Sequence, residues 1–202
     1  MAWHRRGSSS PECDARIDEA FASVRRADFL PEAQRRYEAE DRPLPIGYAA
    51  TNSQPRTVRA MLRLLDVRRG DRVLDVGSGS GWTSALLAHL VGHTGRVLAV
   101  EVVPELVDSS RLVLASEPRP WVSVHQAENN VLGLPAEAPY DRILVSAEAR
   151  TLPPPLVDQI APGGRMVIPV HGRMAVVDRD DHGDVSVRKV GHYAFVPLVW
   201  SG

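Results

Sequence analysis

Four residues near the middle of the chain have the types and the spacing needed to hold a nucleotide-like ligand. Gly77, Gly79 and Gly81 alternate with serines directly after a short apolar run. Glycines permit positive φ and let the backbone approach a ligand closely where a buried strand turns into a helix. Glu101 follows twenty residues after Gly81, where a carboxylate can accept hydrogen bonds from both hydroxyls of a ribose. A tight turn without a ligand is the alternative.

The glycine spacing and a nearby acid discriminate between nucleotide-like cofactors. The spacing is G-x-G-x-G, whereas a pyrophosphate at a helix N-terminus calls for G-x-G-x-x-G. Asp75, two residues before Gly77, would repel a pyrophosphate and attract a cationic nucleoside that carries an amino acid. We therefore expect S-adenosyl-L-methionine rather than NAD. The expected ligands in this region are Asp75, Gly77, Ser78, Gly79 and Glu101.

The elements that must position these residues alternate in type along the chain. Runs rich in Val, Ile and Leu, separated by helical segments, indicate a parallel sheet with helices on both faces. Two further apolar runs around an acidic turn indicate antiparallel strands at the C-terminal edge. We expect an α/β fold with a doubly wound, mostly parallel, seven-stranded sheet. The expected strands are residues 72–76, 96–100, 122–125, 142–146, 165–170, 174–178 and 185–199, and the expected helices are 82–91, 104–115 and 154–160.

The N-terminal quarter of the chain predicts helices followed by a loop. Ser10 and the proline after it form a helix start, and an apolar helix face begins at Ile17. A second helix is expected over residues 31–39, and a third begins at residue 55 with Gly70 as its stop. Residues 41–55 show no clear period, so we expect a long, structured loop of the kind that tends to be functional.

The composition predicts one soluble domain. Of 202 residues, 44% are hydrophobic and 24% charged, which argues against global disorder. A net charge of -1 argues against a nucleic-acid-binding face, and no apolar run reaches the about 18 residues of a membrane span. The single cysteine, Cys13, cannot form an internal disulfide. We expect a cytoplasmic monomer without a metal site. The expected divisions are a flexible tail over residues 1–10 and one domain over 11–202, which comprises N-terminal helices with the loop (11–54) and a cofactor-binding core (55–202).

Several stretches of the chain resemble the protein-L-isoaspartate O-methyltransferases, which are class I S-adenosylmethionine-dependent methyltransferases. The most discriminating stretch is IGYAATNSQP at residues 46–55, which looks like the substrate-side loop of that family. The other matching stretches are residues 73–108, 138–143, 156–165 and 195–198. The resemblance covers roughly residues 21–199 and implies a Rossmann-like methyltransferase fold.

The resemblance implies methyl transfer from S-adenosyl-L-methionine to the α-carboxylate of an isoaspartyl residue in a damaged protein or peptide. The ester then collapses to a succinimide without the enzyme, and part of the succinimide reopens as normal aspartate. Because the carboxylate is already ionised and the sulfonium is a good leaving group, no general base is required, and catalysis depends on alignment. We expect the hydroxyls of Ser53 and Thr51 to hold the carboxylate, with Ala50 and Asn52 on the substrate side. The alternative role of Ser53 is a helix N-cap.

Four positions depart from the family pattern near the expected site. Asn52 stands where an apolar residue is expected, and it either contacts substrate or stabilises the turn. Asn129 stands where the family has an acid that meets the adenine, and its amide oxygen can still accept a hydrogen bond from the adenine amine. Arg150 can clamp a substrate carboxylate or lie in a solvated loop. His171 stands where a glycine is expected, and we place it with Arg150 on the substrate side.

Two other functions fit the same residues. A peptide-tailoring enzyme would esterify an ordinary aspartate in one dedicated substrate and leave an aspartimide. A non-catalytic homologue would bind the cofactor without turnover. For the two enzymatic functions, we expect a partner protein or peptide that contains isoaspartyl or aspartyl residues. For none of the three functions do we expect binding to nucleic acid or a membrane.

Overall fold

The computed structural model describes residues 10–116 and 119–200, so the expected tail over residues 1–10 lies outside the described part except for Ser10. The predicted helix start is confirmed in α1 (Pro11–Ser23), where the Ser10 hydroxyl accepts a hydrogen bond from the backbone N–H of Cys13 at 3.1 Å. Ile17 on the apolar face of α1 is buried. Within the described ranges, no helix has the length and apolar character needed to cross a membrane.

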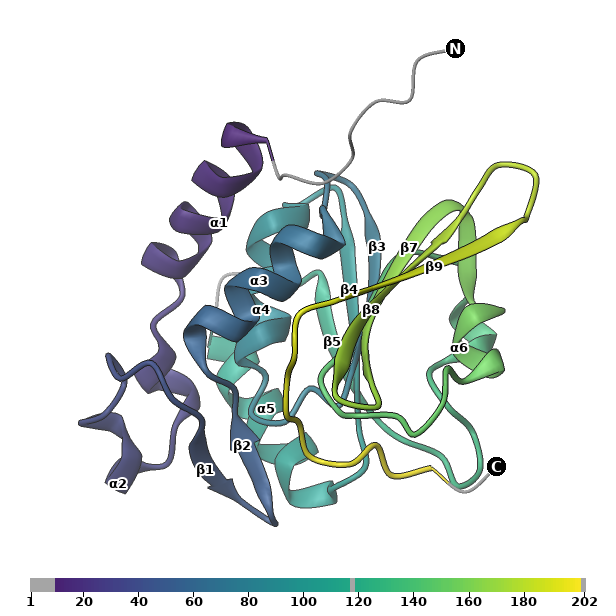
Figure 1. Cartoon of the computed structure of the whole chain (residues 1–202). Coiled ribbons are helices and arrows are strands. Elements are labelled where there is room, and N and C mark those ends of the chain that lie inside the picture. Colours follow the sequence, from purple (N-terminus) through teal and green to yellow (C-terminus); the bar gives the residue numbers. More distant parts are fainter. Residues whose placement is uncertain (1–9, 117–118, 201–202) are drawn as a thin grey trace.

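A seven-stranded sheet forms the centre of the molecule, in the order β5-β4-β3-β6-β7-β8-β9 (Figure 1). Neighbouring strands from β5 to β7 are parallel, and β8 and β9 run antiparallel at the edge. The predicted fold class is therefore confirmed. The strands are β3 (Arg72–Val76), β4 (Arg96–Glu101), β5 (Val122–Gln126), β6 (Tyr140–Val145), β7 (Ile160–Val170), β8 (Arg173–Arg179) and β9 (Val185–Val190).

Helices cover both faces of this sheet, and each face has its own apolar core. One face packs against α3 (Pro55–Leu65), α4 (Trp82–Val91) and α5 (Pro104–Ser116), and α1 packs on α3 and α4 (Figure 1). The other face packs against α6 (Pro154–Val157) and the segments around η2 (Pro135–Glu137). The strand order reverses between β3 and β6, and in open α/β sheets such a switch point leaves a crevice at the carboxyl ends of the strands.

The predicted long loop over residues 41–55 is wrong in part, because it contains a two-stranded hairpin. Its strands are β1 (Leu44–Gly47) and β2 (Ala50–Asn52). The turn between them holds Tyr48 and Ala49 at φ values of 54° and 56°. Residues other than glycine and asparagine rarely adopt this left-handed backbone conformation. Because neither turn residue is of these types, the sequence lacks the usual Asn-Gly signal for a hairpin.

The N-terminal helices also differ from their predicted limits. The helix expected over residues 31–39 is only α2 (Glu32–Arg35), which buries none of its side chains and so gains little from packing. A short helix that was not predicted, η1 (Arg26–Phe29), precedes it. The next helix, α3, ends where Asp66 adopts a left-handed φ of 55°, so Gly70 is not its stop.

Two C-terminal elements are shorter than predicted. The helix expected over residues 154–160 ends with α6, because Ile160 already pairs with β6 as the first residue of β7. The strand expected over residues 185–199 ends with β9 before Gly191, whose φ is 58°. The chain then folds back, and Pro197 pairs with Glu148 beyond the end of β6.

Candidate active site

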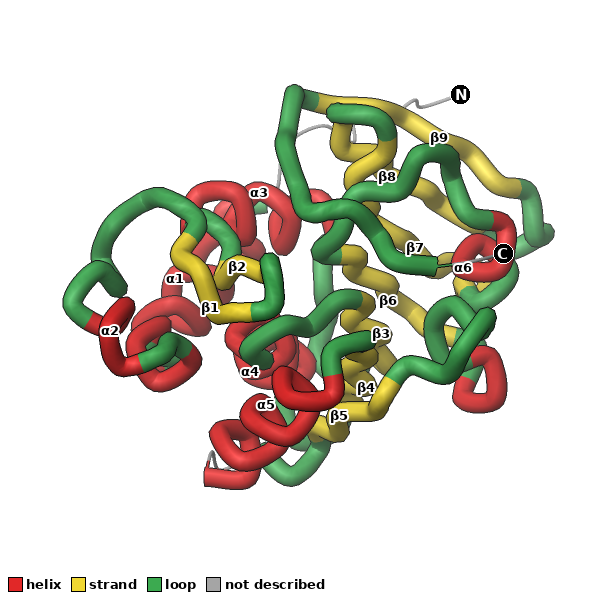
Figure 2. Tube along the Cα trace, turned by 90° about the horizontal axis from the view of Figure 1, so that it is seen from below, coloured by secondary structure: helices red, strands yellow, loops and turns green. Residues whose placement is uncertain are grey.

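A cavity of about 420 Å³ opens at the carboxyl ends of β3, β4 and β6, at the end of the molecule that Figure 2 faces. Its walls come from the hairpin, the glycine loop after β3, the turn after β4, the loop after β5 and the C-terminal segment. These are residues 48–53, 76–80, 100–103, 126–133 and 196–200, together with Trp82, Thr83, Ser146 and Ala147. Segments from both ends of the chain thus meet around one space.

The glycine loop forms the floor of this cavity beside β3. Gly77, Gly79 and Gly81 all have positive φ, between 54° and 86°. The N–H groups of Gly77 and Ser78 both donate to the carbonyl oxygen of Val100 on β4, at 2.8 and 3.2 Å. These bonds fix the loop on the neighbouring strand. Because glycine has no side chain, the backbone of the loop is open to a ligand.

Glu101 is buried at the end of β4 and lines the cavity next to this loop. One carboxylate oxygen accepts the N–H of Gly79 at 2.8 Å. The other accepts the N–H groups of Val102 at 2.7 Å and Val103 at 3.1 Å. Carboxylate oxygens have about four acceptor sites in all. The side chain is therefore fixed by the backbone and can still accept a hydrogen bond from a ligand hydroxyl.

Thr51 and Ser53 of the hairpin side line the same cavity. Thr51 is exposed on β2 and Ser53 is half-buried directly after it. The N-cap of α3 is Gln54, so the alternative role of Ser53 as a helix cap is wrong. Neither hydroxyl has a hydrogen-bond partner among the described residues. Two residues with free hydroxyl donors therefore line the same cavity as the glycine loop and Glu101.

A family model described as protein-L-isoaspartate(D-aspartate) O-methyltransferase matches residues 9–201. The chain belongs to this family. It is 46% identical over 188 residues to a protein-L-isoaspartate O-methyltransferase of Aeropyrum pernix, covering 91% of this chain and 72% of the relative. It is 41% identical over 186 residues to protein-L-isoaspartate O-methyltransferase 2 of Archaeoglobus fulgidus, covering 91% and 84%.

A solved structure from Plasmodium falciparum has the same fold. It is described as a protein-L-isoaspartate O-methyltransferase in complex with S-adenosyl-L-homocysteine, and it superposes with a TM-score of 0.79 at 24% identity. The match covers 92% of this chain and 91% of that one. This likeness agrees with the predicted Rossmann-like fold, and the predicted family is confirmed by the family model and the two relatives.

Asp75, an expected cofactor ligand, is completely buried within the sheet and does not itself line the cavity. Successive strand residues point to opposite faces of a sheet, and Asp75 points toward α4, where the Ser84 hydroxyl donates to its Oδ2 at 2.7 Å. Its Oδ1 has no partner among the described residues. Complete burial raises the pKa of Asp75 to about 7. The hydrogen bond from Ser84 lowers this pKa by a smaller amount, and the negative charge of Glu101 raises it slightly. The buried carboxylate that lines the cavity is that of Glu101.

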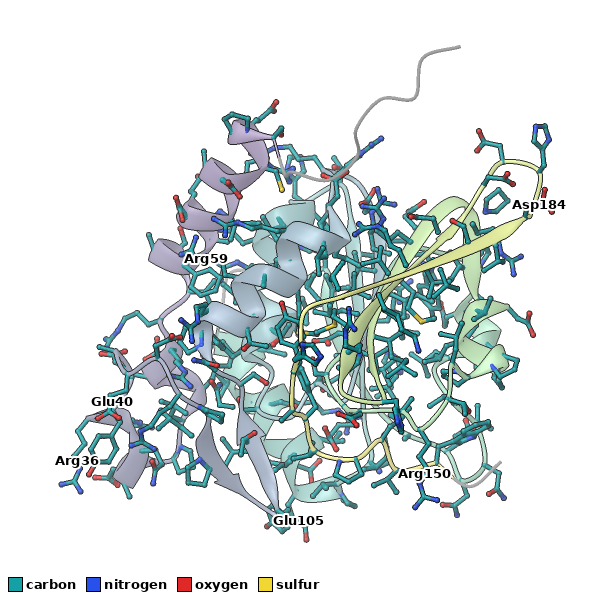
Figure 3. All side chains as sticks on the ribbon, viewed as in Figure 1. Arg36, Glu40, Arg59, Glu105, Arg150 and Asp184 are labelled. Atoms are coloured by element: carbon teal, nitrogen blue, oxygen red, sulfur yellow. The ribbon has the colours of Figure 1, made fainter. Side chains whose placement is uncertain are left out.

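The remaining predicted residues fall into two groups. Asn129 is exposed and lines the cavity in the loop after β5. Arg150 and His171 are exposed and do not line it, so their expected place on the substrate side stays a prediction. Figure 3 shows Arg150 far from the hairpin, near the C-terminal segment. His171 occupies the turn between β7 and β8 with a left-handed φ of 50°, at a position where a glycine was expected.

Arg26 does not line the cavity, but it is a buried residue that supports the cavity wall and that sequence reasoning missed. Its guanidinium donates to the Asn52 side chain at 2.8 Å and to the carbonyl oxygens of Asn52 and Ser53 at 3.2 and 3.0 Å. Further bonds reach the carbonyl oxygens of residues 38, 40 and 42, and burial lowers the pKa of Arg26 to about 10. Asn52, expected at the substrate, is buried with its amide used by the protein. The acceptors that Arg26 binds come from segments distant in the sequence, so no local sequence signal could have identified this residue.

Proposed function

We propose that the protein transfers a methyl group from S-adenosyl-L-methionine to the α-carboxylate of L-isoaspartyl residues in damaged proteins or peptides. The observation that carries this proposal is the shared cavity, which is lined by Glu101 and the glycine loop and also by Thr51 and Ser53, whose hydroxyls are free. Membership of the family favours this repair reaction over the tailoring and non-catalytic alternatives.

The residues of the glycine-loop side fit an adenosyl cofactor. The open backbone at Gly77, Ser78 and Gly79 would hold its amino-acid portion, and Glu101 would accept the ribose hydroxyls. Asn129 would meet the adenine amine through its amide oxygen. When bound, S-adenosyl-L-methionine supplies a methyl group on a positively charged sulfur that is a good leaving group.

The residues of the hairpin side fit the acceptor. A free α-carboxylate has a pKa of about 3.5 and is ionised at neutral pH, so no protein group has to remove a proton. The Thr51 and Ser53 hydroxyls would donate to one carboxylate oxygen and leave the other directed at the methyl group. Buried Val76, Trp82 and Leu132 line the same cavity and limit access of water. The protein thus acts chiefly by alignment.

The proposal extends to the organisation of the chain. Residues 11–202 would act as one catalytic domain, in which residues 11–54 supply the acceptor wall and residues 55–202 supply the cofactor wall. The domain would work as a cytoplasmic monomer, and size-exclusion chromatography with light scattering tests the oligomeric part.

The decisive experiment uses methyl-labelled cofactor and two peptides that differ only in one isoaspartyl or aspartyl linkage. We expect label in the isoaspartyl peptide alone, as a base-labile ester. Label in both peptides to the same extent, or in neither, would refute the repair assignment.

A further inference from the structure

A side-chain hydrogen bond joins the acceptor wall to the cofactor wall of the cavity. The Asn52 side-chain N–H on β2 donates to the Ser80 hydroxyl in the glycine loop, and the two heavy atoms lie 3.1 Å apart. Beside it, the Ile46 side chain lies so close to Gly79 that a Cβ at that position would meet it at 3.2 Å. The hairpin that carries Thr51 and the loop expected to hold the cofactor are therefore in direct contact.

The orientation of the Asn52 amide is fixed by a donor behind it. Arg26 donates from Nε to the Asn52 Oδ1 at 2.8 Å, and a guanidinium has no acceptor. The amide oxygen must therefore face Arg26, and the NH₂ group must face Ser80. The bond to Ser80 is thus set by the network and not by a free choice between two amide orientations.

The same guanidinium prevents the base of the hairpin from moving by itself. Arg26 also binds the carbonyl oxygens of Asn52 and Ser53, and Asn52 is 4% exposed. Separating these buried groups would leave polar atoms without partners, which costs about 1–3 kcal/mol for each group. A shift of the glycine loop at Ser80 is therefore transmitted to the backbone that carries the acceptor hydroxyls.

We infer that Asn52 is a positioning residue that couples occupancy of the glycine loop to the order of the hairpin. The inference rests on the cofactor site of the proposed function. A bound cofactor contacts the glycine loop and restrains it further, the Asn52–Ser80 bond passes this restraint to β2, and Thr51 and Ser53 are then held for the acceptor carboxylate. Because linkage is reciprocal, an acceptor bound at the hairpin strengthens cofactor binding by the same factor.

Hydrogen–deuterium exchange with S-adenosyl-L-homocysteine as the probe tests this coupling without turnover. In the wild-type protein at saturation, we expect exchange in residues 44–52 to slow by about fivefold or more, the lower end of typical coupling between sites. In Ser80→Ala, residues 126–133 remain protected by the ligand while the effect on residues 44–52 is lost. In Ser80→Thr, which keeps the hydroxyl, we expect the slower exchange in residues 44–52 to return.

A matched control removes a hydroxyl that takes no part in the contact. Ser109→Ala on α5 deletes a hydroxyl that bonds only within its own helix, to Leu106, and should behave as the wild type does. Thermal unfolding of each variant, together with calorimetry of the probe, ensures that folded proteins are compared at equal saturation.

Each outcome decides the inference. Slowed exchange of the hairpin in Ser80→Ala, equal to that in the wild type, would overturn it, because protection would then come from the ligand itself. An unprotected hairpin in the wild type, with residues 126–133 protected, would overturn it as well. Protection nowhere would remove the cofactor site and the inference together. Protection as predicted but without methylation of an isoaspartyl peptide would sustain the coupling and reject the proposed function.

Discussion

Glu101 accepts a hydrogen bond from the backbone N–H of Gly79 at 2.8 Å, so the buried carboxylate that lines the cavity also holds the glycine loop in place. The same side chain accepts two N–H groups from the turn that follows β4. One residue therefore links β4, the loop after β3 and the expected ribose position. Its loss should weaken the cofactor site both directly and through the shape of the loop.

The first prediction concerns this carboxylate. Glu101→Gln replaces one acceptor oxygen by a donor that faces backbone N–H groups, so we expect the Kd for S-adenosyl-L-homocysteine to rise about tenfold or more, as for a lost hydrogen bond to a charged group. Isothermal calorimetry measures it. Glu105→Gln, an exposed position on the first turn of α5, serves as the control and should leave the Kd unchanged. Equal affinities of Glu101→Gln and wild type would remove Glu101 from the cofactor site.

The second prediction concerns the acceptor hydroxyls. Ser53→Ala and Thr51→Val each remove one donor to the substrate carboxylate, and we expect kcat/KM for an isoaspartyl peptide to fall by about 10- to 100-fold. The Kd for S-adenosyl-L-homocysteine should stay within about twofold. Thr57→Val on α3 removes a hydroxyl that bonds Gln54 outside the cavity and should keep full activity. Full activity of both cavity variants would show that other groups hold the carboxylate.

The third prediction is a pH dependence of stability at Asp75. Burial raises its pKa to about 7, above the unfolded value of about 3.9, so the folded state binds this proton more tightly. The stability that protonation of Asp75 contributes to the folded state is therefore fully present below about pH 4 and is lost as the pH rises toward 7. Asp75→Asn abolishes this dependence. Wild-type stability should fall relative to that of the variant by about 4 kcal/mol across this window, measured by urea unfolding at a series of pH values. A pH-independent difference would contradict the assigned pKa.

The fourth prediction concerns Arg26. Arg26→Leu removes the donor to the buried Asn52 side chain and carbonyl oxygen and to the part-buried carbonyl oxygens of residues 40 and 42, so the free energy of unfolding should fall by about 3 kcal/mol or more. Chemical denaturation measures the loss. The neighbouring Arg25 is exposed and forms only a solvated ion pair with Glu38 at 3.6 Å, so Arg25→Leu should cost less than about 1 kcal/mol. Similar losses for both variants would show that the Arg26 network adds little.

The features that the sequence predicted well are those with a local signal. The glycines at 77, 79 and 81 follow a buried strand and precede a helix, and both neighbours appear at their predicted bounds in β3 and α4. The pattern of apolar runs likewise predicted which segments form the strands and that the strands at the C-terminal edge are antiparallel, although not the order of the strands in the sheet. Thr51 and Ser53 were placed in the cavity wall by the resemblance of their loop to the family.

The features that the sequence did not predict depend on three-dimensional context. Asp75 lies in a strand that is buried on both faces, so its apolar pattern does not reveal which residue points toward the cavity. Tyr48 and Ala49 adopt left-handed backbone in the hairpin turn after Gly47, although neither is a glycine or an asparagine. Arg26 gathers acceptors from segments 12 to 27 residues away, and such a network exists only in the folded chain.

The most direct test of the central claim is the ratio of kcat/KM for an isoaspartyl peptide to that for its aspartyl twin, measured with wild type and Ser53→Ala. We predict that only the isoaspartyl peptide is methylated at a measurable rate and that Ser53→Ala slows this reaction while binding S-adenosyl-L-homocysteine normally. Equal values for the two peptides, or no methylation by a protein that binds the cofactor product, would contradict a cavity built to align an isoaspartyl carboxylate with a methyl donor.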